Sequence, residues 1–186
     1  MAKYKSIDKT RKITYMAILT ALVFTLQAIA PLFPVSANSL ALGIVPIIVG
    51  AAMYGPFCGM WLGLVFAGAT LSLDLQKISP FLNENWFFAV ITIIFKMVFA
   101  GAVCGLVYKL IAKENEIVAA IVASIVAPLV NTSMYIVCCL LFFFDYVEGF
   151  AILGVATLPN VIVEFLMCPI LAPALIRVAL AFKRLK

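Results

Sequence analysis

A succession of long apolar runs, separated by short polar segments, dominates this sequence. Of its 186 residues, 66% are hydrophobic and 11% are charged, whereas a soluble domain usually has about 45–50% and about 25%. A helix needs about 20 apolar residues to cross the hydrocarbon core of a bilayer. The sequence therefore predicts a single, all-α integral membrane domain, and it excludes a soluble enzyme, a disordered tail and a disulfide-stapled secreted domain.

We count six such runs, of which the second is the least regular. It is short and contains Pro46, so we expect it to be tilted, broken or only partly inserted. Gly55-Pro56 predicts the turn after it. The first substantial aqueous loop is expected at residues 74–85, before the interfacial Trp86. In the single domain 1–186, the predicted spans cover residues 13–31, 40–54, 57–73, 86–111, 117–144 and 158–182.

The charged residues predict the orientation of these spans. The net charge is +5, and loops rich in Lys and Arg stay on the cytoplasmic side. With six spans and a cytoplasmic N-terminus, the C-terminus is cytoplasmic too, and ten of the 13 basic residues face inward. The charge thus indicates topology rather than a nucleic-acid-binding patch. The ten residues are Lys3, Lys5, Lys9, Arg11, Lys12, Lys109, Lys113, Lys183, Arg184 and Lys186.

The residue types that usually carry catalysis are scarce. There is no histidine, so imidazole acid–base chemistry and imidazole metal sites are excluded. The sequence contains no phosphate-binding loop of the Gly-x-x-x-x-Gly-Lys-Ser/Thr type, and we expect no cofactor, no metal and no enzyme activity in this chain. The five cysteines lie in apolar runs without CxxC spacing and are interpreted as small core residues; they are Cys58, Cys104, Cys138, Cys139 and Cys168.

Small residues spaced four apart mark surfaces where membrane helices approach closely. The third and fourth runs contain such stripes, which we expect to form helix contacts inside the bundle. The first run contains another, and its contact is left open. The stripes are Gly55, Gly59, Gly63 and Ala67 in the third run, Gly101 and Gly105 in the fourth, and Ala17, Ala21, Thr25 and Ala28 in the first.

Several of these motifs together resemble a known family. Ala17-Ile-Leu-Thr-Ala21 lies in the first run, and Val45-Pro-Ile-Ile-Val-Gly-Ala-Ala-Met-Tyr-Gly-Pro56 leads into Gly59 and Gly63. With the chain length and the six runs, they resemble the substrate-binding S component of an energy-coupling factor (ECF) vitamin transporter. The resemblance covers nearly the whole chain.

This resemblance implies a six-helix protein of a bacterial plasma membrane that captures a water-soluble vitamin or related micronutrient from outside. It further implies association with a transmembrane coupling subunit and two cytoplasmic ATPases. The face of Ala17 and Ala21 would then dock the coupling subunit. The alternative is that these alanines pack against a neighbouring helix of the same chain.

Two charged residues, Lys96 and Glu164, fall in the interior of predicted spans, whereas Lys109 and Arg177 lie near the inner ends of theirs. Such groups cost about 2.5–3.5 kcal/mol to insert and normally face the bundle interior. Asn160 lies one turn before Glu164 on the same face, and Asn131 lies midway along the fifth span. Lys96 and Glu164 form either an ion pair that fixes helix packing or part of a ligand pocket, and both interpretations can hold together.

The resemblance implies that the pocket lies in the outer half of the fourth to sixth helices, under the outside loop that contains Asn38. Trp86 and Tyr135 are candidates to contact the ligand, although interfacial anchoring explains Trp86 equally well. An ammonium group at Lys96 suits a carboxylate. Pantothenate is therefore the first prediction, with folate, niacin and biotin left open.

Two other functions compete with this interpretation. One is a stand-alone secondary transporter or channel that works as a homodimer and uses Lys96 and Glu164 as its coupling pair. The other is a membrane-embedded enzyme that modifies a lipid. Such an enzyme would need clustered acids, metal ligands or an activated nucleophile, and the sequence provides none of these.

Overall fold

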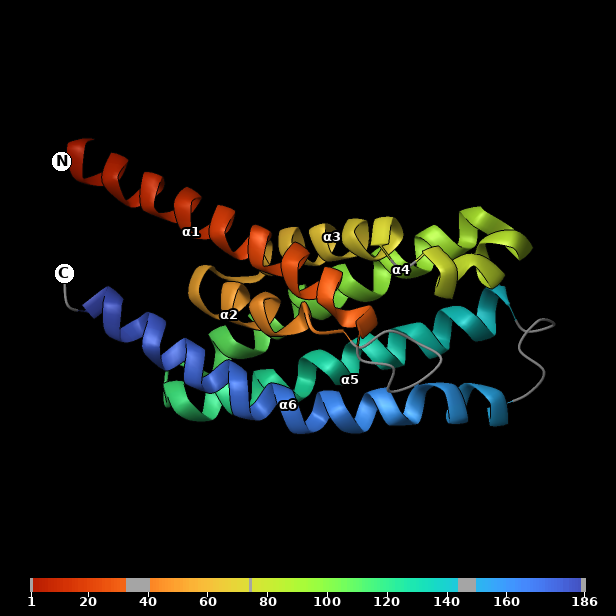
Figure 1. The fold of residues 1–186 in the computed structure, drawn as a ribbon. Coiled ribbons are helices and arrows are strands. Elements are labelled where there is room, and N and C mark those ends of the chain that lie inside the picture. Colours follow the sequence, from red (N-terminus) through yellow and green to blue (C-terminus); the bar gives the residue numbers. More distant parts are fainter. Residues whose placement is uncertain (1, 33–40, 74, 144–149, 185–186) are drawn as a thin grey trace.

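The computed structural model describes residues 2–32, 41–73, 75–143 and 150–184, and within these residues all regular structure is helical (Figure 1). Five helices are long and apolar enough to cross a membrane, and another apolar helix is shorter. The predicted all-α architecture is thus confirmed. The elements are α1 (Ala2–Ile29), η1 (Ala30–Leu32), α2 (Ile44–Tyr54), α3 (Pro56–Leu73), α4 (Leu75–Ile111), α5 (Glu116–Phe142) and α6 (Phe150–Arg184).

The short helix α2 occupies the centre of the bundle. It has 11 residues, and every residue from Ile44 to Ala51 is buried. It packs against α1, α3, α4, α5 and α6. A helix that is hydrophobic all round needs such an enclosed position. Because protein surrounds it, α2 does not need the length that a lipid-facing span requires.

The turn between α2 and α3 depends on Gly55. This residue has a φ of 90°, and its N–H donates to the Ala51 carbonyl at 2.9 Å. Only glycine adopts this conformation readily. Pro56 is the first residue of α3, where its missing N–H costs nothing. The predicted Gly55-Pro56 turn is confirmed.

Glycines allow α3 and α4 to approach until their backbones touch. A Cβ atom added to Gly59 would overlap the carbonyl oxygen of Gly101, and one added to Gly101 would overlap that of Gly59. One turn further along, a Cβ on Gly63 would overlap the carbonyl oxygen of Met97. Gly59, Gly63, Gly101 and Gly105 therefore form helix contacts inside the bundle, as predicted. Gly55 does not, because it lies in the turn and a Cβ there would meet nothing within 4 Å.

Helix α4 begins earlier than the predicted fourth span and is interrupted once. Asn85 has non-helical angles (φ −155°, ψ 97°), and its Oδ1 accepts a hydrogen bond from the Phe88 N–H at 3.3 Å. It therefore caps the segment that begins at Trp86. The prediction of a loop at residues 74–85 is wrong for residues 75–84, which are helical. Polarity suggested the loop, but residues such as Gln, Lys and Glu are also good helix formers.

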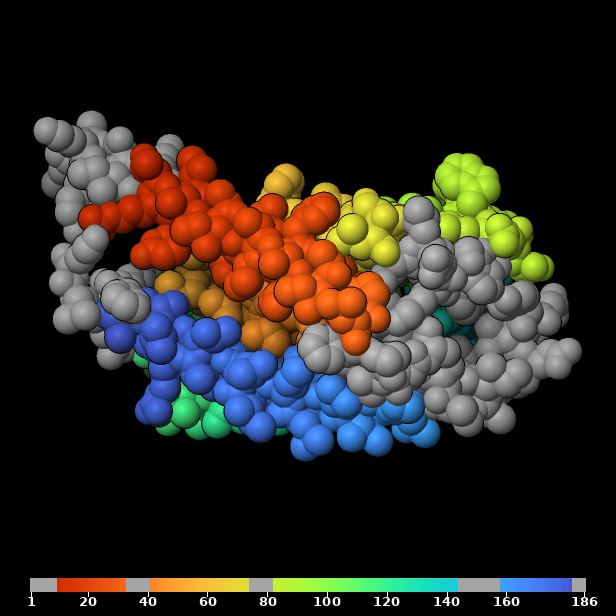
Figure 2. Space-filling view, viewed as in Figure 1, coloured from red at the N-terminus to blue at the C-terminus, as the bar shows by residue number. Residues whose placement is uncertain are grey.

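Helix α1 lies at the edge of the bundle. Among the α-helices of the described residues it packs only against α2 and α3, and Figure 2 shows it running across the outer surface of the molecule. It starts at Ala2, well before the predicted span, because Lys and Arg are compatible with a helix. The start of α1 and the end of α6 lie at the same end of the bundle (Figure 1).

Candidate functional site

Three polar side chains from three different helices meet inside the bundle. Glu164 on α6 and Asn131 on α5 are 4% and 6% exposed. The Asn131 amide lies beside the Glu164 carboxylate, and the Lys96 ammonium on α4 is within electrostatic range of that carboxylate. The structure therefore brings together the polar residues that the sequence singled out in the fourth, fifth and sixth runs.

The aromatic ring of Tyr135 completes one side of this group. The Lys96 Nζ lies 4.8 Å from the centroid of the Tyr135 ring, which is the geometry of a cation–π contact. Tyr135 lies four residues after Asn131, so α5 presents both side chains on one face. The Tyr135 side chain also lies beside the Cys139 thiol.

Helix α6 adds a second polar residue and a link to the centre of the bundle. Asn160 is 7% exposed and lies one turn before Glu164. The Glu164 Oε1 accepts a hydrogen bond from the Ala41 backbone N–H at 3.4 Å. Ala41 lies three residues before α2, so this carboxylate joins α6 to the chain that enters the central helix.

Two further residues, Thr92 and Cys138, lie at the site although the sequence did not predict them there. Thr92 lies one turn before Lys96 on α4, is 4% exposed and lies beside the Cys138 thiol of α5. Lys96 is within electrostatic range of that thiol. The four-residue spacing between Thr92 and Lys96 indicates that both lie on one face of the helix. Threonine is common in apolar helices, so this spacing alone does not indicate a site.

Three buried oxygen atoms of this group lack hydrogen-bond partners within the described residues. They are Thr92 Oγ1, Asn131 Oδ1 and Glu164 Oε2. Most buried polar atoms in proteins are hydrogen-bonded, so each exception needs an explanation. A binding site provides such an explanation, because the bound molecule supplies the missing hydrogen-bond partners.

An aromatic layer lies against this polar group on α4 and α5. Phe88 and Phe142 stack with ring centroids 4.5 Å apart and an interplanar angle of 6°. Tyr135 packs against the same cluster, which includes Ala89, Cys139 and Phe143. Tyr135 thus contacts both the polar group and the aromatic layer.

One predicted contact, Trp86, lies outside the buried group. Trp86 is 68% exposed, and its ring packs edge-on against Phe87 at 5.9 Å, which suits an interfacial anchor. Asn38 lies outside the described residues. The polar group therefore consists of Thr92, Lys96, Asn131, Tyr135, Cys138, Asn160 and Glu164, which we call the Lys96 site.

The stripe on α1 lies elsewhere, on the outer surface. Ala17, Ala21, Thr25 and Ala28 are all exposed. Within the described part of the chain, α1 contacts no α-helix other than α2 and α3. Packing of Ala17 and Ala21 against a neighbouring helix is therefore not observed within the described residues.

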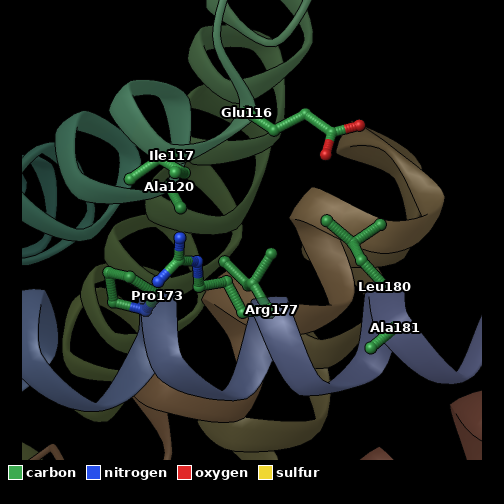
Figure 3. A pocket seen from close by; sticks show the side chains of 8 residues that line it. Glu116, Ile117, Ala120, Pro173, Arg177, Leu180 and Ala181 are labelled. Carbon is green, nitrogen blue, oxygen red and sulfur yellow. The ribbon is translucent and has the colours of Figure 1, made fainter.

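A groove at the end of the bundle where α5 begins and α6 ends holds none of the Lys96 site (Figure 3). It has a volume of about 520 Å³ and is lined mainly by apolar side chains, with Glu116 and Arg177 as its charged residues. Arg177 points toward α5 in Figure 3. Among the described residues, no three Cys, Asp or Glu side chains come together as a metal site.

Comparison with known families gives one match. A protein-family model described as ECF transporter, substrate-specific component, matches residues 11–182. This range contains the whole Lys96 site and the stripe on α1. No curated protein matches the chain.

Proposed function

The chain belongs to the family of ECF transporter substrate-specific components, and from this premise we propose that it captures a water-soluble vitamin or related micronutrient at the Lys96 site. Members of this family are membrane subunits that bind a transported substrate and are not enzymes. We propose pantothenate as the substrate. The protein would then deliver it to a coupling module that consists of a transmembrane subunit and two ATPases.

The observation that carries this proposal is the convergence of Lys96, Asn131 and Glu164 in an otherwise apolar bundle. A buried group of this kind in a membrane helix is costly and usually functional. One ammonium group matches the carboxylate of pantothenate. The amide and hydroxyl side chains around it match its hydroxyl and amide groups. The aromatic layer at Phe88 and Phe142 offers a surface for an aliphatic part of the substrate.

We also propose six membrane crossings with both ends in the cytoplasm of a bacterial cell. The positions of the basic residues support this topology, and so does the location of the start of α1 and the end of α6 at one end of the bundle (Figure 1). On this topology the Lys96 site opens toward the outside. The groove at Arg177 lies toward the cytoplasm.

The test is the identity of the small molecule that copurifies with the protein, determined by mass, followed by titration of the purified protein with pantothenate. The Lys96→Met change keeps most of the length of the unbranched side chain and removes its charge. We expect this change to weaken binding more than tenfold, since a buried charged hydrogen bond is commonly worth more than about 1.4 kcal/mol.

Lys109→Met is the matched control, because Lys109 is an exposed residue near the C-terminal end of α4. It should leave affinity unchanged. If Lys96→Met folds normally and binds with the affinity of the wild-type protein, Lys96 does not contact the substrate. If only a cation or a donor-free compound copurifies, pantothenate is the wrong substrate.

A further inference from the structure

The buried oxygen atoms around Lys96 indicate which groups a bound molecule must carry. We propose that Asn131, Glu164 and Thr92 determine specificity by accepting hydrogen bonds from the cargo. The cargo is then an anion that also bears at least two hydroxyl or N–H groups. This inference rests on the proposed function, because it concerns the substrate of the same site.

The three atoms come from three helices and are all deeply buried. Thr92, Asn131 and Glu164 are 4%, 6% and 4% exposed, and their Oγ1, Oδ1 and Oε2 atoms lack a partner within the described residues. Leaving a buried polar atom without a partner destabilises the folded protein. A molecule that forms hydrogen bonds with all three atoms would remove this destabilisation when it binds.

Buried hydroxyl groups elsewhere in the bundle do have partners. Thr70 on α3 is 9% exposed, and its hydroxyl donates to the Phe66 carbonyl at 3.0 Å. Ser124 on α5 is fully buried, and its hydroxyl donates to the Ala120 carbonyl at 2.6 Å. The missing partner of the Thr92 hydroxyl is therefore not a general property of buried hydroxyl groups in this fold.

The chemistry of the atoms gives the direction of the hydrogen bonds. An amide oxygen and a carboxylate oxygen only accept, whereas a hydroxyl both donates and accepts. A plain carboxylate or a ketone brings only acceptors, so it would leave Asn131 Oδ1 and Glu164 Oε2 without partners. The Lys96 ammonium, which only donates, contacts the anionic group of the cargo. Two donors on the cargo must therefore contact Asn131 and Glu164.

The first experiment measures binding of five carboxylate vitamins to the purified full-length protein by thermal shift and calorimetry. Pantothenate, biotin and folate carry hydroxyl or N–H donors, whereas nicotinate and lipoate carry none in their anionic forms. We expect one of the first three to bind and both of the last two to bind at least tenfold more weakly. Tightest binding of nicotinate or lipoate would overturn donor recognition and leave an anionic vitamin as the substrate.

The second experiment changes the acceptors. Glu164→Gln keeps the shape of the side chain and turns one acceptor oxygen into a donor, and Glu116→Gln makes the same change at an exposed residue. We expect Glu164→Gln alone to lower affinity for the bound vitamin, or the amount of copurified small molecule, more than tenfold. Equal retention by the two variants contradicts the proposal.

A third measurement does not depend on the identity of the cargo. Thr92→Val and Thr70→Val remove one hydroxyl each at nearly constant volume. In ligand-free protein, Thr92→Val should leave Tm unchanged or raise it, and Thr70→Val should lower it. If none of the five vitamins binds, the anionic substrate of the proposed function is wrong. Donor recognition then fails as well if Thr92→Val lowers Tm as much as Thr70→Val.

Discussion

Two stripes of small residues run along helices of this bundle, and their surroundings differ completely. On α3, Gly59, Gly63 and Ala67 are buried, and the two glycines touch the backbone of α4. On α1, Ala17 and Ala21 have the same spacing but are exposed. Spacing alone therefore indicates a surface suited to a helix, and it does not tell whether that helix belongs to the same chain.

The position of each helix in the bundle explains the difference. Helix α3 lies between α1, α2 and α4, whereas α1 is at the edge and contacts only α2 and α3 among the other α-helices of the described chain. The one hydroxyl group on the α1 stripe is satisfied within the helix, because the Thr25 hydroxyl donates to the Ala21 carbonyl at 2.9 Å. A second helix could therefore pack on the stripe without leaving this hydroxyl without a partner. In lipid, such a smooth surface gains stability when another helix packs on it.

The largest effect is expected from enlarging the buried stripe. Gly59→Leu and Gly101→Leu each place a side chain where the opposite helix has its backbone. Overpacking a core typically costs about 1–3 kcal/mol, and more where the backbone itself must move. We expect loss of monodisperse protein in detergent or a large fall in Tm, measured by size-exclusion chromatography and thermal denaturation.

Ala21→Leu is the matched control, since it adds a bulky side chain to the exposed stripe. This variant should purify like the wild-type protein. Equal yields and equal Tm values for Gly59→Leu and Ala21→Leu would show that the contrast between the two stripes is wrong.

Much of the fold followed from the apolar runs, and its exceptions have physical reasons. Residues 57–73 were predicted as a span, and α3 is helical from Pro56 to Leu73. The central place of α2 could not be predicted, because an 11-residue apolar helix suits either a buried core or partial insertion. Residues 75–84 were assigned to a loop because polarity marks the membrane boundary but does not exclude a helix.

The next effect concerns transport rather than folding. If the stripe docks the coupling subunit, Ala17→Trp or Ala21→Trp should lower substrate uptake more than tenfold in cells that contain the coupling module, because an indole ring keeps a second helix from the stripe. Ligand affinity and Tm of the purified protein should stay at wild-type values, since both positions are exposed. Uptake of radiolabelled vitamin and calorimetry provide the two measurements.

Leu22→Trp is the control for this pair. Leu22 is 39% exposed and lies about 140° around the helix from Ala17 and about 100° from Ala21. It should retain uptake. Normal uptake by Ala17→Trp and Ala21→Trp would remove the stripe as a docking surface, and equal loss by all three variants would indicate a general defect of α1.

The site was partly predictable for a similar reason. Lys96, Asn131 and Glu164 stand out because lipid tolerates them poorly, and the structure brings them together. Thr92 is too common in apolar helices to stand out. The contact of Glu164 with Ala41 uses a backbone N–H, and no side-chain pattern reveals such a contact. Trp86 was assigned two roles because an aromatic residue at the end of a span suits both.

The smallest effect compares two glycines on α3 under the same substitution. Gly63→Ala places a methyl group against the Met97 carbonyl of α4, whereas a Cβ at Gly68 meets nothing within 4 Å. Alanine is favoured over glycine inside a helix by about 0.5–1 kcal/mol, and the Ser72 hydroxyl still reaches the Gly68 carbonyl at 2.8 Å. Gly68→Ala should therefore raise Tm slightly, and Gly63→Ala should lower it. If the two changes in Tm have opposite signs, close approach to α4, and not glycine content, determines which small residues the bundle requires. If Tm rises for both variants, α3 and α4 can separate at little cost.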